Sequence, residues 1–576
     1  QLNPEFLGII FERLVNKADG AVYTPRTEVD LMCRLSLVKW LEKNNTTNIP
    51  LRDLYELFFK EGGRNASSDE QRDGCFSTNQ YKDILALLER ITICDPAVGS
   101  GAFPVGMLHV LDEIEQKVRQ KIANPDYELA DFERKKRIIS NSLYGVEVKE
   151  WAVWISQLRL WITLFIDAPD ELKHSQEAIL PSLDFKMRCG DSLVQRIGSK
   201  LFPVQGHADI KKHLKAKITQ LKQLKADFFN NKVKTPLLVK KMELDLFSAI
   251  ITEEIKAKRE FIERHKSPNT LKEQMGFLQF DVADVKEKMP LFEDCVDAVQ
   301  KEIEELEEER SCLLHEHPLV WNIEFAEVFA DNGGFDIVIG NPPYVRQEGI
   351  SDPTGKIASA KEYKGMLQEM CCSDFHDYFM NIKKKVVEKI DAKSDLYTYF
   401  YIRSLRLLNE KGLLTFICSN SWLDVGYGAW LQKFLLKKAP VHFILDNHAK
   451  RSFEAADVNT IISIIDAPQK KASEDHLIKF VAFKQPFEDV IFSENLIAIE
   501  ETKEILKTQE YRVYPISACS LYEAGLEYED DVEKTLDNGK YAGDKWGGKY
   551  LRAPDIFFTI LEKGKDKLVR LGDIAE

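Results

Sequence analysis

The sequence lacks the features of a membrane, secreted or zinc-ribbon protein. It has no run of the roughly 18 apolar residues that a membrane span needs, and its N-terminus carries no secretory pattern. Its ten cysteines are scattered, only Cys371 and Cys372 are adjacent, and no C-x-x-C pair occurs. These absences argue against a disulfide framework and a zinc ribbon, and we expect reduced thiols in a cytoplasmic protein.

The chain also lacks an excess of basic charge. Its formal net charge is −14, whereas proteins that bind nucleic acid concentrate Lys and Arg against the phosphates. Taken alone, this charge argues against a nucleic-acid partner. The objection weakens if a basic face is local, or if DNA is read by a region outside this chain.

The pattern of apolar residues is that of an α/β protein. The chain has 576 residues, of which 44% are apolar and 30% charged, so it is globular and too long for one hydrophobic core. Short apolar runs alternate with helical stretches before residue 206 and again after residue 321. This alternation predicts parallel strands with helical crossovers, which form a doubly wound, Rossmann-like sheet.

A long charged stretch interrupts that alternation. Residues 207–317 contain helix-periodic segments whose early part is basic and whose late part is acidic. This distribution predicts an insertion of antiparallel helices that pair with each other. It favours a solvated helical hairpin over a DNA clamp.

A glycine-rich turn follows the first predicted strand of the sheet. In the run DPAVGSGAF (95–103), Gly99 and Gly101 permit a tight turn before a helix, and Asp95 stands at the strand tip. Such a turn lets the backbone approach a ligand closely. The run has neither the lysine of a Walker loop nor the G-x-G-x-x-G spacing. By itself it is compatible with many α/β loops.

Two acidic residues stand at the ends of later predicted strands. Glu147, in LYGVEV, occupies the position at which doubly wound sheets bind ribose hydroxyls. Asp191, in CGDSL, could accept a hydrogen bond from an adenine amine. Each residue in isolation is equally explained as a surface acid.

The most specific local pattern is NPPY (341–344). The apolar strand FDIVIG (335–340) runs directly into Asn341 and two prolines, which fix an extended backbone. The Asn341 side-chain oxygen and the Pro342 carbonyl then form two acceptors for the two hydrogens of an amine. Tyr344 supplies a face on which a base can stack, a contact of about 1–3 kcal/mol per base.

These motifs and their order resemble the gamma-class DNA methyltransferases that modify adenine N6. An aromatic-Thr-Pro run (23–25), the glycine-rich turn, the acidic strand end, GDSL and NPPY follow one another as in that family. The resemblance covers roughly residues 8–200 and 325–500. The most similar groups are the large methylases of type IIG restriction–modification systems and of the BREX and DISARM phage-defence systems.

The resemblance implies roles for individual residues. Asn341, Pro342, Pro343 and Tyr344 would be catalytic, with Tyr344 stacked on a flipped base. The cofactor S-adenosylmethionine, which becomes S-adenosylhomocysteine, would contact Tyr23, Thr24, Pro25, Asp95, Pro96, Ala97, Gly99, Ser100, Gly101, Glu147, Val148, Asp191, Ser192 and Asn341. Among these, Glu147 would hold the ribose and Asp191 the adenine amine. The residues expected near the target base or DNA are Tyr344, Asn420, Trp422 and Phe453.

The resemblance also implies a domain order and partners. It predicts an N-terminal helical region with a capping loop (1–75), a cofactor-binding half (76–206), the helical insertion (207–320), a catalytic half (321–500) and a linker (501–576) to a target-recognition domain mostly absent from this chain. Double-stranded DNA is the expected partner, and other defence-system subunits are further candidates. No membrane is involved, and no metal is required because the sulfonium methyl group is already activated.

Three alternatives stay open. One is a fused restriction enzyme: Glu147-Val148-Lys149 spells part of a nuclease motif, but it lies in the cofactor strand, and a nuclease could still lie before residue 1. The chain could instead be a non-catalytic subunit that binds cofactor and DNA. It could also modify protein or RNA, since a glutamine amide presents a similar NH2 group. We expect host-DNA protection in a phage-defence system, with a type IIG enzyme as the alternative.

Overall fold

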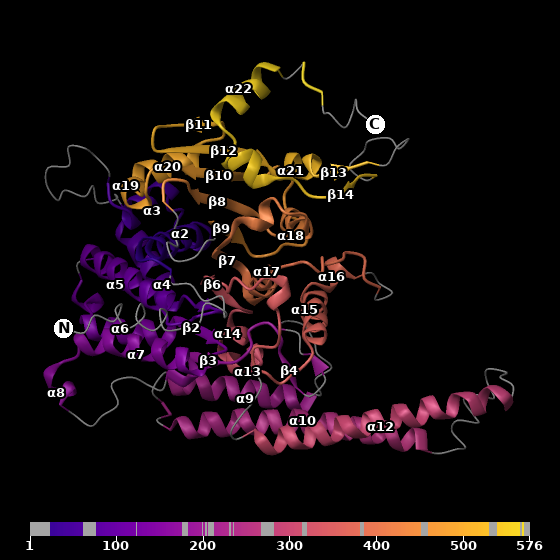
Figure 1. Cartoon of the computed structure of the whole chain (residues 1–576). Coiled ribbons are helices and arrows are strands. Elements are labelled where there is room, and N and C mark those ends of the chain that lie inside the picture. Colours follow the sequence, from indigo (N-terminus) through magenta and orange to yellow (C-terminus); the bar gives the residue numbers. More distant parts are fainter. Residues whose placement is uncertain are drawn as a thin grey trace.

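The computed structural model describes most of the chain. The described residues are 24–61, 76–122, 124–174, 183–197, 200–201, 204, 212–229, 232–233, 235–266, 282–313, 319–380, 385–450, 459–528, 538–564 and 567–569. Within this part, no helix combines the length and the apolar character of a membrane span. The described elements form a large central sheet, helices on both of its faces and an outlying helical extension (Figure 1).

A ten-stranded sheet runs through the described part of the molecule. Its strands are β1 (Ile93–Asp95), β2 (Leu143–Glu147), β3 (Met187–Cys189), β6 (Phe335–Gly340), β7 (Leu408–Ser419), β8 (Val441–Asn447), β9 (Thr460–Asp466), β10 (Leu477–Phe483), β11 (Leu506–Lys507) and β12 (Tyr511–Ser517). They lie in the order β11-β12-β10-β8-β9-β7-β6-β1-β2-β3. The run β7-β6-β1-β2-β3 is parallel, whereas β9 is antiparallel to both β7 and β8.

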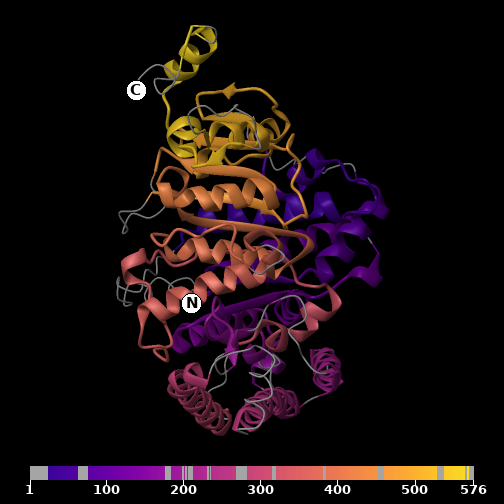
Figure 2. The same ribbon diagram turned by 90° about the vertical axis from the view of Figure 1, so that its right-hand side faces the viewer.

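Helices cover both faces of this sheet, as the side view in Figure 2 shows. One core joins the first face to α2 (Arg26–Asn44), α3 (Leu51–Phe58), α4 (Thr78–Arg90), α5 (Ala102–Ile122), α6 (Asp131–Asn141), α7 (Glu150–Ile166), α19 (Phe487–Val490) and α20 (Ser493–Glu501). The other core joins the second face to α13 (Trp321–Glu324), α14 (Ala326–Asp331), α15 (Ala360–Asp374), α16 (His376–Phe379), α17 (Leu396–Leu407), α18 (Ala429–Lys438) and α21 (Ala518–Ala524). In β6, Ile337 and Ile339 belong to the first core and Val338 to the second. The predicted doubly wound α/β fold is confirmed.

Short elements complete the described part of the chain. They are α8 (Asp170–Lys173), α22 (Asp555–Gly564), the strand pairs β4 (Arg196–Ile197) with β5 (Lys200–Leu201) and β13 (Leu526–Glu527) with β14 (Lys540–Tyr541), and the single turns η2 (Pro125–Tyr127), η3 (Leu183–Phe185), η4 (Gln347–Gly349), η5 (Asn420–Leu423), η6 (Gly426–Gly428) and η7 (Gly547–Leu551). Local sequence explains where some helices begin. The side chains of Ser77 and Gln80, for example, form a capping box at the start of α4.

The helical insertion projects from the β3 side of the molecule (Figure 1). It consists of α9 (Lys212–Phe229), α10 (Pro236–Lys266) and α12 (Val282–Cys312). Lys258 pairs with Glu302 and Arg259 pairs with Glu307, so basic side chains of α10 meet acidic side chains of α12. Arg310 of α12 also donates to the Thr252 hydroxyl of α10, so α12 runs antiparallel to α10, and the predicted antiparallel pairing is confirmed.

A buried ionic cluster fastens this insertion to the core. Arg188 of β3 forms salt bridges with Glu243 of α10 at 2.6 Å and with Glu324 of α13 at 2.8 Å. Lys225 of α9 pairs with Glu243 at 2.6 Å and donates to the Ile323 carbonyl at 2.9 Å. All four charged side chains are buried. Removing one member would leave its partner's charge buried without compensation, so the cluster holds the insertion in one orientation.

Candidate active site

The glycine-rich turn joins the buried tip of β1 to the start of α5. Gly99 has a φ of 50° and Gly101 a φ of 86°, a region that favours glycine. A Cβ atom on Gly101 would also lie 2.7 Å from the Ser156 Oγ atom of α7. From the same helix, Arg159 donates to the Ser100 carbonyl at 2.8 Å. The close approach of α7 therefore requires glycine at position 101, and the hydrogen bond from Arg159 fixes the turn.

Glu147, at the tip of β2, holds that turn in place. Its Oε2 atom accepts a hydrogen bond from Gly99 N at 3.0 Å, and its Oε1 atom accepts from Val148 N at 3.0 Å and Lys149 N at 3.2 Å. Burial raises the pKa of Glu147, while these three backbone donors lower it. The sequence predicts a ligand contact for Glu147, but it does not predict that the Glu147 carboxylate also accepts hydrogen bonds from the backbone of the glycine-rich turn.

Asp95 presents a carboxylate oxygen to the interior of the site. Its Oδ1 atom accepts from Ala97 N at 3.0 Å, whereas its buried Oδ2 atom has no hydrogen-bond partner among the described residues. Burial raises the pKa of Asp95 to about 8, and the neighbouring charge of Glu147 adds to that increase. A buried acceptor of this kind is costly unless a ligand supplies a donor or a positive charge.

NPPY meets the glycine-rich turn at the tip of β6. Gly340 is so close to Asp95 that a Cβ atom there would lie 2.6 Å from the Asp95 Oδ1 atom. The next residue, Asn341, donates from Nδ2 to the Oγ1 atom of buried Thr24 at 3.0 Å. This bond joins NPPY to the aromatic-Thr-Pro run, whose Pro25 caps α2. It also turns the side-chain oxygen of Asn341 away from Thr24.

Replacing Gly340 with alanine is therefore expected to destabilise the fold. The added methyl group must displace a buried carboxylate, and overpacking of this kind costs about 1–3 kcal/mol in the free energy of unfolding. Urea unfolding followed by circular dichroism would measure it. Gly365→Ala in α15 is the matched control, because a Cβ atom there meets nothing within 4 Å. Equal stability of the two variants would contradict the close approach.

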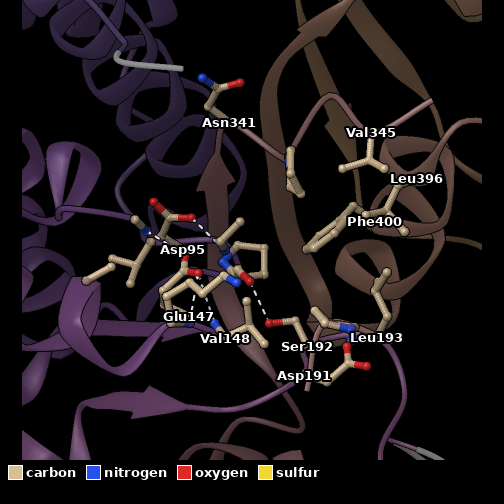
Figure 3. Close-up of a pocket in the computed structure, with 18 of the residues that line it drawn as sticks. Asp95, Glu147, Val148, Asp191, Ser192, Leu193, Asn341, Val345, Leu396 and Phe400 are labelled. Atoms are coloured by element: carbon tan, nitrogen blue, oxygen red, sulfur yellow. Dashed lines mark hydrogen bonds between the residues drawn. The ribbon is translucent and has the colours of Figure 1, made fainter. Parts of the chain in front are cut away.

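One cavity of about 310 Å³ connects these residues. It opens where the carboxyl ends of β1, β2, β3 and β6 meet, the usual ligand position in doubly wound sheets. The predicted residues that line it are Thr24, Asp95, Pro96, Ala97, Gly99, Ser100, Glu147, Val148, Asp191, Ser192, Asn341 and Pro343. Figure 3 shows Asp95 and Glu147 on one side of the cavity, with Val345, Leu396 and Phe400 opposite.

Asp191 and Ser192 follow β3 and form the far end of this cavity. Ser192 donates from its hydroxyl to the Pro96 carbonyl at 2.5 Å, which ties the β3 loop to the glycine-rich turn. The Asp191 carboxylate accepts from Leu193 N at 2.8 Å and from the Tyr363 hydroxyl at 2.8 Å. Tyr363 also lines the cavity, although it lies 172 residues away in sequence.

Some predicted residues do not line the cavity. Tyr23 and Phe453 lie outside the described residues, while Pro25, Gly101, Pro342 and Tyr344 adjoin the site without lining it. Tyr344 is half-buried, and its hydroxyl donates to the Ile417 carbonyl at 3.5 Å. Asn420, in η5, is also half-buried, and its backbone N–H donates to the Asn459 carbonyl at 3.0 Å.

The structure corrects the prediction for Trp422. Its side chain is fully buried, with its ring packed against the rings of Tyr401 and Trp546. A base could reach it only if this part of the core opened. Trp422 is therefore a core residue in this structure, and its side chain is not exposed for contact with DNA.

The sequence motifs alone do not predict part of the cavity wall. The segment directly after NPPY contributes Gly349, Ile350, Ser351 and Pro353, and Tyr363 follows in α15. Their position immediately after NPPY was the signal in the sequence from which a place in the cavity wall could have been predicted. Helix α17 also shapes the pocket, because its Leu396 and Phe400 line it.

Comparison with known proteins identifies the family. The family model described as "Eco57I restriction-modification methylase" matches residues 141–453. The chain belongs to this family of methylases. A second model, described as "MmeI, DNA-methyltransferase domain", matches residues 69–195. Together the two matches span residues 69–453, which include the cavity-lining residues named above except Thr24.

The chain is also similar to individual restriction–modification proteins. RM.MjaORFECS2P of Methanocaldococcus jannaschii, assigned as a type II restriction enzyme and methyltransferase, is 24% identical over 573 residues, which is 90% of this chain and 42% of the relative. The type II methyltransferase M.BstVI of Geobacillus stearothermophilus is 34% identical over 24% of this chain and 19% of its own length. The type IIL enzyme MmeI, solved with DNA, aligns over 83% of this chain and 42% of its own, with a TM-score of 0.37 and 15% identity. The methylase chain thus spans less than half the length of these relatives.

Proposed function

We propose that this chain is the catalytic part of a DNA methyltransferase that transfers a methyl group from S-adenosylmethionine to adenine N6. The observation that carries the proposal is one cavity lined by both Asn341 of NPPY and the carboxylates of Asp95 and Glu147. A site for group transfer needs a binding place for the donor beside acceptors that orient the nucleophile. Family membership in the Eco57I methylases supports the same reaction class.

The residues present fit this cofactor. The buried Asp95 Oδ2 atom, which lacks a protein partner among the described residues, suits a positively charged methionine end. Glu147 would face the ribose and Asp191 the adenine amine, at successive strand tips of one cavity. When bound, S-adenosylmethionine would supply a methyl group activated by positive sulfur: the N–C bond would form as the S–C bond breaks, S-adenosylhomocysteine would leave, and the proton of the methylated amine would pass to solvent water.

The chain itself would orient the target amine. The Asn341 side-chain oxygen and the Pro342 carbonyl would each accept one amine hydrogen, which directs the nitrogen lone pair into the cavity. Tyr344 would stack on the base, which must leave the duplex at a cost of a few kcal/mol. Catalysis would then come mainly from positioning and from fixed dipoles.

Transfer of labelled methyl groups tests this proposal directly. The full-length protein would be incubated with tritiated S-adenosylmethionine and unmodified duplex DNA, and the DNA digested to nucleosides. We expect label in N6-methyladenine. Label in a methylated cytosine would overturn the choice of base, and label in protein glutamine would overturn the choice of substrate. Cofactor binding without transfer to any substrate would instead indicate a non-catalytic subunit.

The biological system has two candidates. One is the protection of host DNA by a phage-defence system of the DISARM or BREX type. The other is a type IIG enzyme, and the M. jannaschii relative favours it because that protein is assigned as both restriction enzyme and methyltransferase. Cleavage of unmethylated DNA by the full-length protein with Mg²⁺ would support the second candidate, and methylation without cleavage the first.

The raised pKa of Asp95 predicts that both stability and cofactor affinity depend on pH. Because burial raises this pKa to about 8, the free protein carries a proton there at pH 7 that the unfolded chain has lost. The contribution of Asp95 to stability therefore falls as pH rises from about 4 to 8. A cationic cofactor requires the ionised form, so its affinity should rise about tenfold per pH unit below pH 8.

Calorimetry of cofactor binding from pH 6.5 to 8.5 would measure this slope. Asp95→Asn is the control, because the titration of the cofactor itself is the same for both proteins. We expect a shallower slope for Asp95→Asn and weaker binding at pH 8.5. Parallel slopes for the two proteins would contradict a proton on Asp95.

A further inference from the structure

The segment that joins NPPY to α15 forms one wall of the cavity. We call residues 345–363 the strap. Its first residues are anchored to α17, because Leu396 N donates to the Val345 carbonyl at 3.0 Å and Gln347 N donates to the Asp395 carboxylate at 3.0 Å. The strap therefore leaves the catalytic motif along a fixed path.

The middle of the strap is organised around Asp352. Its Oδ1 atom accepts from the backbone and hydroxyl of Thr354 at 2.8 and 2.7 Å, and its Oδ2 atom accepts from Ile357 N at 2.7 Å. Ser359 then caps α15 by accepting from Glu362 N at 3.3 Å. These bonds fix the shape of the strap.

The strap ends on Tyr363, which contacts the predicted adenine ligand Asp191. Tyr363 is 2% exposed, and its hydroxyl donates to the Asp191 Oδ2 atom at 2.8 Å. Leu193 N holds the Oδ1 atom at 2.8 Å. One donor on each oxygen fixes the plane of the carboxylate and leaves the remaining lone pairs of each oxygen to accept from a ligand. Burial raises the pKa of Asp191, and the hydrogen bonds from Leu193 and Tyr363 oppose that increase.

We propose that Tyr363 is a positioning residue for cofactor recognition. It orients the Asp191 carboxylate toward the exocyclic amine of the cofactor's adenine, and the strap links this recognition to the segment that carries Asn341. The inference rests on the proposed function, because it takes S-adenosylmethionine as the ligand of this cavity. It assigns a role to a residue outside every motif found in the sequence.

Removing the Tyr363 hydroxyl tests the proposal. Binding of S-adenosylhomocysteine to wild type and Tyr363→Phe would be compared by calorimetry with binding of an analogue whose purine lacks the exocyclic amine. We expect Tyr363→Phe to bind S-adenosylhomocysteine about tenfold more weakly, the scale of one hydrogen bond to a charged group. Affinity for the amine-free analogue should stay within about twofold, because that ligand makes no bond for Tyr363 to orient.

Tyr399→Phe is the matched control. Tyr399, on α17, is buried like Tyr363, and its hydroxyl bonds Gln368 of the same helix α15. This variant removes a buried hydroxyl that holds α15 without touching Asp191, so both affinities should match wild type. In an Asp191→Asn background, Tyr363→Phe should have a reduced effect on S-adenosylhomocysteine.

The outcomes separate the inference from the function on which it rests. Equal losses for both ligands in Tyr363→Phe would mean a general structural role and would overturn the positioning role. No loss for either ligand would overturn it as well. If the wild-type protein bound neither ligand although a urea unfolding transition showed that it was folded, the proposed function would fail and the inference with it.

Discussion

Replacing Asn341 with alanine is expected to reduce methyl transfer by at least about a hundredfold, the scale of losing one preorganised polar contact to a reacting group. The side-chain oxygen is proposed to accept a hydrogen from the target amine, so its loss weakens the transition state more than the bound cofactor. Its NH2 group bonds Thr24, which belongs to the segment before α2. Cofactor affinity should change much less than the rate, because Asp95, Glu147 and Asp191 stay in place to bind the cofactor.

Two further variants sharpen this expectation. Asn341→Asp keeps an acceptor oxygen, and the Thr24 hydroxyl can donate to it in place of accepting, so we expect substantial recovery of activity. Asn44→Ala is the matched control, because its amide donates to the Trp40 carbonyl within α2 at 2.9 Å and does not line the cavity. Single-turnover transfer and calorimetry would be measured on each protein. An Asn341→Ala enzyme with the normal rate, or with equal losses of rate and affinity, would contradict this role.

Sequence patterns located the strands of the site because each pattern is local. The run FDIVIG predicts a strand over 335–340, and β6 has those bounds. Apolar runs that end on turn-forming or polar residues leave little freedom in where a strand stops. Since parallel strands end at one edge of a sheet, the motifs at their tips had to meet there.

Interactions between distant residues could not be predicted in this way. The Tyr363 hydroxyl reaches Asp191 across 172 residues, and no periodicity connects them. The same holds for the buried salt bridge between Arg188 and Glu243. Glu243 belongs to the insertion, which the sequence predicts to be a solvated hairpin. Trp422 shows the opposite error, because an aromatic residue beside a motif resembles a ligand contact until its burial is known.

Replacing Glu147 with alanine should have the second large effect, a loss of cofactor affinity of at least about a hundredfold. The carboxylate accepts from the backbone N–H groups of Gly99, Val148 and Lys149. Alanine would leave these donors without their acceptor, at about 1–3 kcal/mol for each one that stays buried. The glycine-rich turn would lose its clamp at the same time as the ribose loses its proposed acceptor. Calorimetry with S-adenosylhomocysteine would measure the loss of affinity.

Glutamine at position 147 separates these two contributions. Its single oxygen can accept either from Gly99 or from the pair Val148 and Lys149, while its NH2 group would face a donor on the other side. We therefore expect Glu147→Gln to bind more weakly than wild type but more tightly than Glu147→Ala. Glu150→Ala makes the same change at an exposed position in the first turn of α7, outside the cavity wall, and should bind normally. If Glu147→Ala also bound normally, neither the clamp nor the ribose contact could be important, because both depend on this one carboxylate.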